Sequence, residues 1–155
     1  MITLRSIKKA ITTALKSKFP TYKVHFDNVD TSDAPYFYVE MRPAVKTWDR
    51  IVSERTIQID VQFIPTLDTY GRADRAQLYD AADALECVFR PVFQIEDRYI
   101  TVLEAETTFV DDIAHYIFDL DFADAFTKEE IGGIQYELMQ QLGLEFNGND
   151  VTEEE

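Results

Sequence analysis

A run of alternating apolar and polar residues from Ile51 to Ile64 is the sequence feature that most constrains the fold. Such alternation is typical of a strand with one buried and one exposed face. The run has fourteen residues and would extend for about 45 Å, which is longer than the sheet of a small domain usually requires. Together with an alternating segment from Tyr36 to Arg42, it predicts a β-hairpin over residues 36–64 whose tip, near residues 43–53, projects beyond the core.

The rest of the chain shows the patterns of helices and shorter strands. Apolar residues recur at every third or fourth position in three segments, which predicts helices at residues 3–18, 72–89 and 127–142. Further strands are predicted at residues 22–27, 93–95 and 99–101, then extended chain to Phe109, a turn at Asp111–Asp112 and a strand at residues 115–122. The predicted order is α-β-β-β-α-β-β-β-α. It indicates an α+β fold with an antiparallel sheet and helices mainly on one face.

The hydrophobic pattern sets the expected domain boundaries. We expect a single domain over residues 1–126, a C-terminal helix over residues 127–146 and an acidic tail over residues 147–155. Thr127 and Glu130 have the spacing of a capping box, which marks a helix start. The tail has no packing pattern, so we expect it to be dispensable for folding.

Charge excludes some classes of partner. The 155 residues include 15 Lys and Arg against 29 Asp and Glu, a net charge of −14, so we expect binding neither to nucleic acid nor to a membrane surface. Residues 1–26 hold six bases and no acid, whereas residues 104–155 hold one base and 15 acids. This segregation has two interpretations, contact with another copy or a charged partner, and two independent solvated faces.

Motifs of known chemistry are absent from the sequence, so we expect no catalytic residues, no cofactor and no bound metal. The best candidate for a site is His115 with Asp119 and Asp121, which alternation places on one strand face where a divalent ion could bind. The alternative is that the three residues form a solvated strand face. The single cysteine, Cys87, is predicted to be a small buried side chain of the second helix rather than a nucleophile.

The tip of the hairpin is the predicted intersubunit contact. Apolar side chains at Val45, Trp48, Ile51 and Val52 would be exposed on a protruding tip, and such clusters usually mark partner surfaces. Two arginines, Arg42 and Arg50, flank the tryptophan, and Trp and Arg are frequent at interface hot spots. The alternative is that Trp48 packs onto its own core.

Several phrases of the sequence, in this order, carry a family resemblance. They are residues 2–11 (ITLRSIKKAI), 18–23 (KFPTYK), 55–63 (RTIQIDVQF), 81–86 (AADALE), 97–100 (DRYI) and 110–122 (VDDIAHYIFDLDF). On these phrases, which cover about residues 1–126, the chain resembles the tail-terminator, or tail-completion, proteins of prophages in Gram-positive bacteria.

The resemblance implies a structural function. Proteins of this kind form a ring, commonly a hexamer, that caps the finished tail tube, ends its polymerisation and offers a surface to the head connector. The implied partners are other copies of the chain, the tail tube protein and the head-completion protein. The implied locations are the host cytoplasm during assembly and the virion tail. Two alternatives remain open at this point, a monomeric or dimeric adaptor and a metal-dependent hydrolase that uses His115, Asp119 and Asp121.

Overall fold

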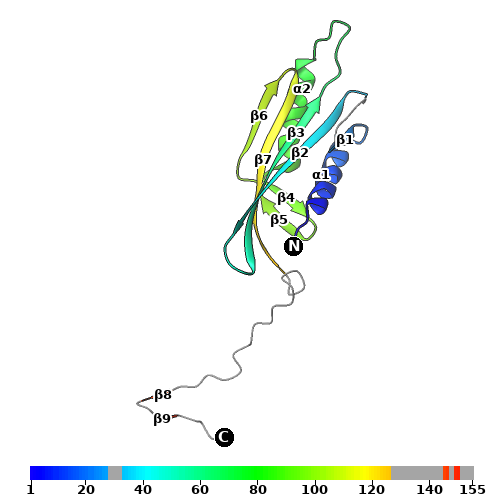
Figure 1. The fold of residues 1–155 in the computed structure, drawn as a ribbon. Coiled ribbons are helices and arrows are strands. Elements are labelled where there is room, and N and C mark those ends of the chain that lie inside the picture. The colour runs from blue at the N-terminus through cyan, green and yellow to red at the C-terminus, as the bar shows by residue number, and fades with distance from the viewer. Residues whose placement is uncertain (28–32, 127–144, 147–148, 151–155) are drawn as a thin grey trace.

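A computed structural model describes residues 1–27, 33–126, 145–146 and 149–150 (Figure 1). Its elements are α1 (Leu4–Lys18), β1 (Lys23–His25), β2 (Tyr36–Thr47), β3 (Val52–Ile64), α2 (Arg75–Phe89), β4 (Val92–Ile95), β5 (Arg98–Thr101), β6 (Ala105–Val110), β7 (Ile113–Ala125), β8 (Glu145–Phe146) and β9 (Asn149–Asp150). The predicted α+β class is confirmed.

The main sheet has five strands in the order β1-β2-β3-β7-β6. Three of its pairings are antiparallel, as predicted, but β1 runs parallel to β2. The predicted antiparallel sheet is therefore confirmed for the main part, with a parallel pairing at this edge. The long connection between His25 and Tyr36 gives the chain room to return to the start of β1, which a tight hairpin turn would not allow.

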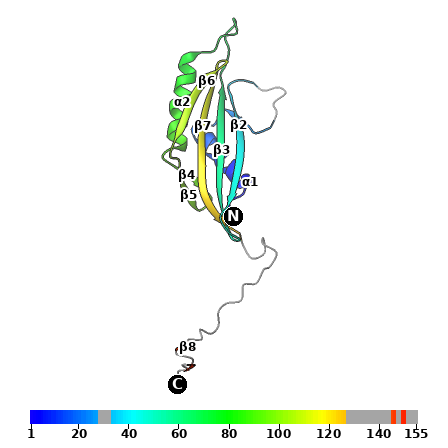
Figure 2. The same ribbon diagram turned by 60° about the vertical axis from the view of Figure 1, so that its left-hand side comes forward.

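Both described helices cover the same face of the sheet, as predicted (Figure 2). Ile7, Ile11 and Leu15 of α1 are fully buried, and the buried stripe of α2 includes Leu78 and Leu85. They pack on the inward-facing side chains of the central strands, which form the core. These are Phe37, Val39, Ile57, Ile59, Val61, Phe63, Tyr116, Phe118, Leu120 and Phe122.

Two of the long strands, β2 and β7, extend further than the sequence pattern indicates. β2 continues through Pro43 to Thr47, because β1 pairs with it only at residues 36–38 and leaves the proline on an open edge where no N–H is required. β3 pairs with β2 on one side and with β7 on the other over nearly its whole length. The far part of the predicted hairpin is therefore one edge of a three-stranded ladder rather than a free ribbon.

Between α2 and residue 126 the chain has one more strand than predicted. The stretch expected to be extended from Tyr99 to Phe109 is divided between β5, which pairs with β4 in a separate two-stranded sheet, and β6, which joins the main sheet. Directly after β5, the Val102 N–H donates a hydrogen bond to the Pro91 carbonyl oxygen.

The start of α2 also differs from the prediction. Asp74 is the N-cap and accepts a hydrogen bond from the Ala76 N–H, while the Asp68 carboxylate holds the Arg72 N–H in the preceding loop. The hydrogen bond from the Arg72 N–H lowers the pKa of Asp68. The helix therefore begins at Arg75 rather than at residue 72.

The predicted C-terminal helix lies mostly outside the described residues. Its last two positions, Glu145 and Phe146, are in β8, where they pair with β9 instead of continuing a helix.

Candidate functional site

The tip of the β2–β3 hairpin exposes a group of apolar side chains. Trp48 is 66% exposed, Val45 is 61% exposed and Ile51 is 38% exposed. Val52 is partly buried, and Arg50 is exposed beside the tryptophan. Figure 1 shows the turn at the end of β2 and β3 that lies away from α2. Of the six residues predicted to form an interface, five therefore gather at or beside the turn.

The sixth residue, Arg42, lies away from the turn. It is opposite Gln58 in the ladder, whereas the last pair before the turn is Thr47 with Ser53. Its guanidinium forms an ion pair with Glu40 of the same strand at 3.1 Å, and this hydrogen bond raises the pKa of Arg42. Arg42 is exposed on the outer edge of β2, and it lies near the tip in sequence but not at the turn itself.

The turn that carries Trp48 is held by a carboxylate. The Asp49 Oδ1 atom accepts hydrogen bonds from the N–H groups of Ile51 and Val52, both at 2.7 Å. The Trp48 N–H donates to the Val52 carbonyl oxygen at 3.1 Å. The backbone hydrogen bonds from Val52 and then from Ile51 lower the pKa of Asp49. Trp48 is therefore presented by an ordered turn.

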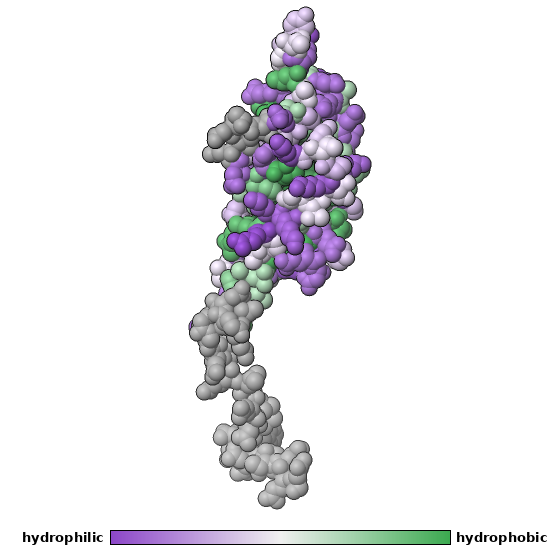
Figure 3. All heavy atoms as spheres, turned by 90° about the vertical axis from the view of Figure 1, so that its right-hand side faces the viewer, coloured by the Kyte–Doolittle hydropathy of each residue, from purple (hydrophilic) through white to green (hydrophobic). Residues whose placement is uncertain are grey.

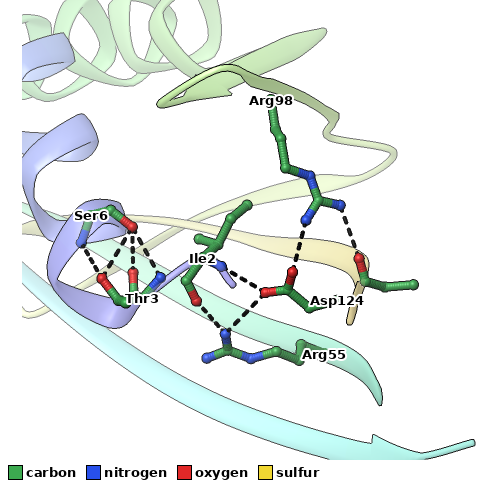
Figure 4. A network of polar contacts seen from close by, with 7 residues as sticks. Ile2, Thr3, Ser6, Arg55, Arg98 and Asp124 are labelled. Carbon is green, nitrogen blue, oxygen red and sulfur yellow. Dashed lines mark hydrogen bonds and ion pairs between the residues drawn. The ribbon is translucent and has the colours of Figure 1, made fainter. Parts of the chain in front are cut away.

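A buried polar cluster lies directly beside the tip (Figure 4). Asp124 of β7 is opposite Ser53 and is only 8% exposed. One carboxylate oxygen accepts the Ile2 N–H at 2.7 Å and lies 3.7 Å from a guanidinium nitrogen of Arg55. The other lies 3.2 Å from a guanidinium nitrogen of Arg98. Asp124 thus connects the N-terminus, β3, β5 and β7.

Two further contacts complete this cluster. Arg55 donates a hydrogen bond to the Ile2 carbonyl oxygen, and Arg98 donates to the Ala123 carbonyl oxygen at 2.9 Å. The guanidinium carbons of both arginines lie about 5.5 Å from the centre of the Phe122 ring, at 5.5 Å and 5.4 Å. Charge that is buried here is therefore paired, hydrogen-bonded and stacked on an aromatic ring.

The sequence analysis missed this cluster, although a signal was present. The inward-facing series Tyr116, Phe118, Leu120 and Phe122 continues with period two to residue 124, so the alternation already placed Asp124 on the buried face. A carboxylate at such a position requires a cationic partner.

The candidate metal ligands lie on one face of β7, as alternation predicted, but each has another neighbour. The Nδ1 atom of His115 lies 3.1 Å from a carboxylate oxygen of Asp60 on β3. Asp121 accepts a hydrogen bond from the Thr56 hydroxyl at 2.6 Å, and Asp119 lies opposite Gln58. Over the part of the chain that the structure describes, no three His, Cys, Asp or Glu side chains are arranged to hold a metal ion.

The prediction that Cys87 is buried was wrong, because Cys87 is exposed. The buried stripe of α2 runs through Leu85 and Phe89, and a residue two positions from each of them points to the opposite side of a helix.

Glu86, on the same helix, accepts a hydrogen bond from the buried Tyr116 hydroxyl at 2.9 Å. Burial and this hydrogen bond raise the pKa of Tyr116.

Basic side chains gather on α1. This helix carries five of the six bases in residues 1–26, a segment without acids. The face of the molecule in Figure 3 is largely hydrophilic, with smaller hydrophobic areas between the polar side chains. The structure therefore presents one basic helix on a chain whose net charge is strongly negative.

Comparison with protein families shows to which family this chain belongs. The model of a family described as "Phage tail terminator protein" matches residues 6–132, most of the chain. The chain belongs to the phage tail terminator protein family. The match includes β2, β3 and the tip between them, and all of β7.

Membership in the terminator family accounts for a structural role in the phage tail. No curated protein matches this terminator chain. Within the described ranges of the chain, no helix has the length and apolar character needed to cross a membrane.

Proposed function

We propose that this terminator forms a ring, a hexamer, on the end of the finished tail tube. The ring ends polymerisation of the tube and provides the surface to which the head-completion protein joins. The source in this proposal is a prophage of a Gram-positive host. The observation that carries the proposal is the ordered, exposed apolar tip with Trp48 at its centre, in a chain of the terminator family.

A closed ring requires two different patches that meet between neighbouring subunits. The tip provides one of them. A Trp that is 66% exposed beside Val45 and Ile51 leaves apolar surface in contact with water. Burial of such a side chain against a neighbour is favourable, and Trp is enriched among the residues that dominate binding energy.

The outer edge of β6 is suited to be the second patch. Val110 is 52% exposed, Phe109 is 38% exposed, and Leu103, just before the strand, is 73% exposed. The Phe109 ring meets the half-exposed Tyr79 ring of α2 edge-on, with 5.4 Å between the ring centres. β6 lies at the opposite edge of the sheet from β1 and β2, so the two patches are separate surfaces of one subunit.

The charges of the two patches are complementary. The tip, residues 45–52, carries two bases and one acid, whereas residues 103–112 carry four acids and no base. Opposite potentials guide two patches into register more than they add to affinity. They also disfavour contact between two tips or between two β6 edges. This arrangement supports head-to-tail association, the kind that closes into a ring.

The test compares Trp48→Ala with Tyr99→Ala, a control at a similarly exposed aromatic residue, since Tyr99 is 70% exposed. Purified full-length protein is mixed with the tail tube protein of the same phage. Particle shape and mass are measured by electron microscopy and native mass spectrometry, and tube lengths are recorded. We expect rings and tubes of uniform length for wild type and Tyr99→Ala.

For Trp48→Ala we expect association to weaken by roughly 30-fold or more, which corresponds to a loss of about 2 kcal/mol. Rings should be lost and tubes should continue to grow. Monomers or dimers of the wild-type protein bound to finished tubes would instead indicate an adaptor. Rings that form equally well with Trp48→Ala would place the contact elsewhere.

A further inference from the structure

Within the described part of the chain, one face of the main sheet is not covered by a helix, because α1 and α2 both lie on the other face. Beside β6 this outer face is hollowed, and the hollow has a volume of ≈ 190 Å³. Such a volume would hold about six water molecules of about 30 Å³ each, so it fits the end of one long side chain rather than a helix. The side chains that line it include Gln58, Glu104, Glu106, Ile117 and Asp119.

Three carboxylates line this hollow without a cation of their own. Glu104 directly precedes β6, Glu106 belongs to β6, and Asp119 belongs to β7. Among the described residues none of the three forms an ion pair. Asp112, just beyond the other end of β6, does have a partner, Arg75, at 3.3 Å. Like charges that share a small space repel one another, so a cation from outside would be attracted to the hollow.

The hairpin tip carries the complementary charge. Its bases, Lys46 and Arg50, are both exposed, and neither forms an ion pair within the described ranges. Lys46 is opposite Glu54 in the β2–β3 ladder, so it has an acidic neighbour in its own subunit. Arg50 lies in the turn beside Trp48, where the Asp49 carboxylate holds the backbone. Arg50 is therefore the base that an ordered turn presents to another molecule.

Arg50 does not reach the hollow of its own subunit. Ser53 forms the last ladder pair before the turn, and Gln58, which lines the hollow, lies five positions further along β3. Five positions of strand correspond to about 17 Å, and Arg50 lies beyond Ser53 on the far side. β6 is also two strands away from β3 in the sheet. A cation that fills the hollow therefore comes from another molecule.

We propose that the outer face beside β6 receives the Arg50 side chain from the tip of a neighbouring copy. The inference rests on the proposed ring and names the contact that sets the register between its subunits. Glu106, exposed on the edge strand, is the acceptor. A guanidinium can donate two parallel hydrogen bonds to one carboxylate, which fixes direction as well as adding energy. Leu103, 73% exposed and next to Glu104 in the chain, offers apolar surface to Trp48 of the same tip.

A second copy is the occupant because one chain supplies both halves of the contact. The tip has the unpaired base and the outer face has the unpaired acids, and the two lie on separate parts of the subunit. In a closed ring every tip meets one hollow, so that every subunit satisfies both halves. The contact also continues the apolar surface of the β6 edge that is proposed above as the second patch.

The test exchanges the two charges in the full-length protein. Ring formation on tail tubes of the same phage is measured by electron microscopy over a series of subunit concentrations. Arg50→Glu and Glu106→Arg should each raise the concentration for half-maximal ring formation by about tenfold or more, because each change brings like charges together. The two changes combined should restore it to within about threefold of wild type.

Matched controls reverse a charge elsewhere on the surface. Lys23→Glu on β1 and Asp83→Arg on α2 change exposed residues without an ion pair in the described ranges, and should shift the concentration by less than about threefold. Urea denaturation checks the folding of each variant. If Glu106→Arg lowers stability, Asp119→Arg takes its place in the exchange with Arg50→Glu.

The outcomes separate this contact from the ring itself. Absence of rings in wild type would overturn both proposals. Wild-type rings that are lost in Trp48→Ala but unaffected by Arg50→Glu, or not restored by the exchange, would overturn the Arg50 contact and leave the ring. Equal weakening in the control variants would show that net charge governs association, and would also overturn the contact. Restoration by the exchange alone supports it.

Discussion

The hairpin tip and the Asp124 cluster are neighbours at the same end of the sheet, and each departs from the usual rule that apolar side chains are buried and charged ones exposed. The tip places apolar side chains in water, with Trp48 66% exposed, whereas the cluster places a carboxylate at 8% exposure. Exposed apolar patches and buried charges are the informative exceptions in a folded protein. Here the buried charge has partners within its own subunit, whereas the exposed apolar group is the surface that we propose as an intersubunit contact.

The largest expected effect is the loss of folding stability in Asp124→Ala. Removal of the carboxylate leaves Arg55, whose side chain is 11% exposed, without its ion pair and leaves the Ile2 N–H without its acceptor. Loss of one partner of a buried pair costs about 3–5 kcal/mol. Urea denaturation measures it, with Asp121→Ala, an exposed aspartate of the same strand, as the control. Equal stability of the two variants would contradict the role assigned to the cluster.

A smaller loss is expected for Arg98→Ala. Its ion pair with Asp124 is on the more exposed side of the cluster, because the Arg98 side chain is 38% exposed. The expected cost is about 1 kcal/mol, because solvent screens this contact. Arg55→Ala should cost more. The same denaturation series ranks the two arginines, and the reverse order would show that burial does not set the strength of these contacts.

A still smaller change in folding is expected for Trp48→Ala. Its side chain is mostly exposed, and substitutions of this kind usually change stability by less than about 0.5 kcal/mol. The midpoint of urea unfolding should therefore match that of wild type, even where ring formation is lost. A loss of about 3–5 kcal/mol, the range for a truncated core aromatic residue, would mean that Trp48 packs on the core in solution.

The smallest expected effect is a pH dependence confined to the tip. The pKa of Asp49 lies below the ordinary value of 3.8 because its carboxylate accepts backbone hydrogen bonds. Its contribution to the turn is therefore present above pH 3.8 and is lost as the pH falls through the lowered pKa. Trp48 is the single tryptophan, so its fluorescence anisotropy should fall in that range.

Two controls separate this local change from general acid unfolding. Far-UV circular dichroism recorded over the same pH range should change at a different pH. Asp49→Asn, which carries no titratable group, should remove the transition in anisotropy. A transition that persists in this variant would assign the effect to another group.

The local parts of the fold could be predicted from the sequence. The alternation in β3 and β7 correctly identified the inward faces of both strands, and the three-and-four spacing correctly identified the buried stripe of α1. These patterns depend on neighbours along the chain. The length of β2 was underestimated because Pro43 is allowed at an open edge, and the pattern of one strand does not show which strands will be its neighbours.

The missed and mistaken features depend on contacts between distant residues. The Asp124 cluster joins positions 2, 55, 98 and 124, and the His115–Asp60 contact depends on the register between β3 and β7. Neither is encoded in a short window of sequence. The error at Cys87 had a different cause, since helical phase relative to Leu85 already places it on the outer side of α2.

Pro43 has a consequence for the protein before it reaches a tail. Strands of other chains can pair with an open strand edge, and such pairing leads to aggregation of free subunits. At Pro43 the edge of β2 offers no N–H donor, and the charged side chains of Glu40, Arg42 and Lys46 border it. Such an edge resists uncontrolled fibre growth. If copies associate through this end of the molecule, as we propose, the contact is made by side chains rather than by added strands.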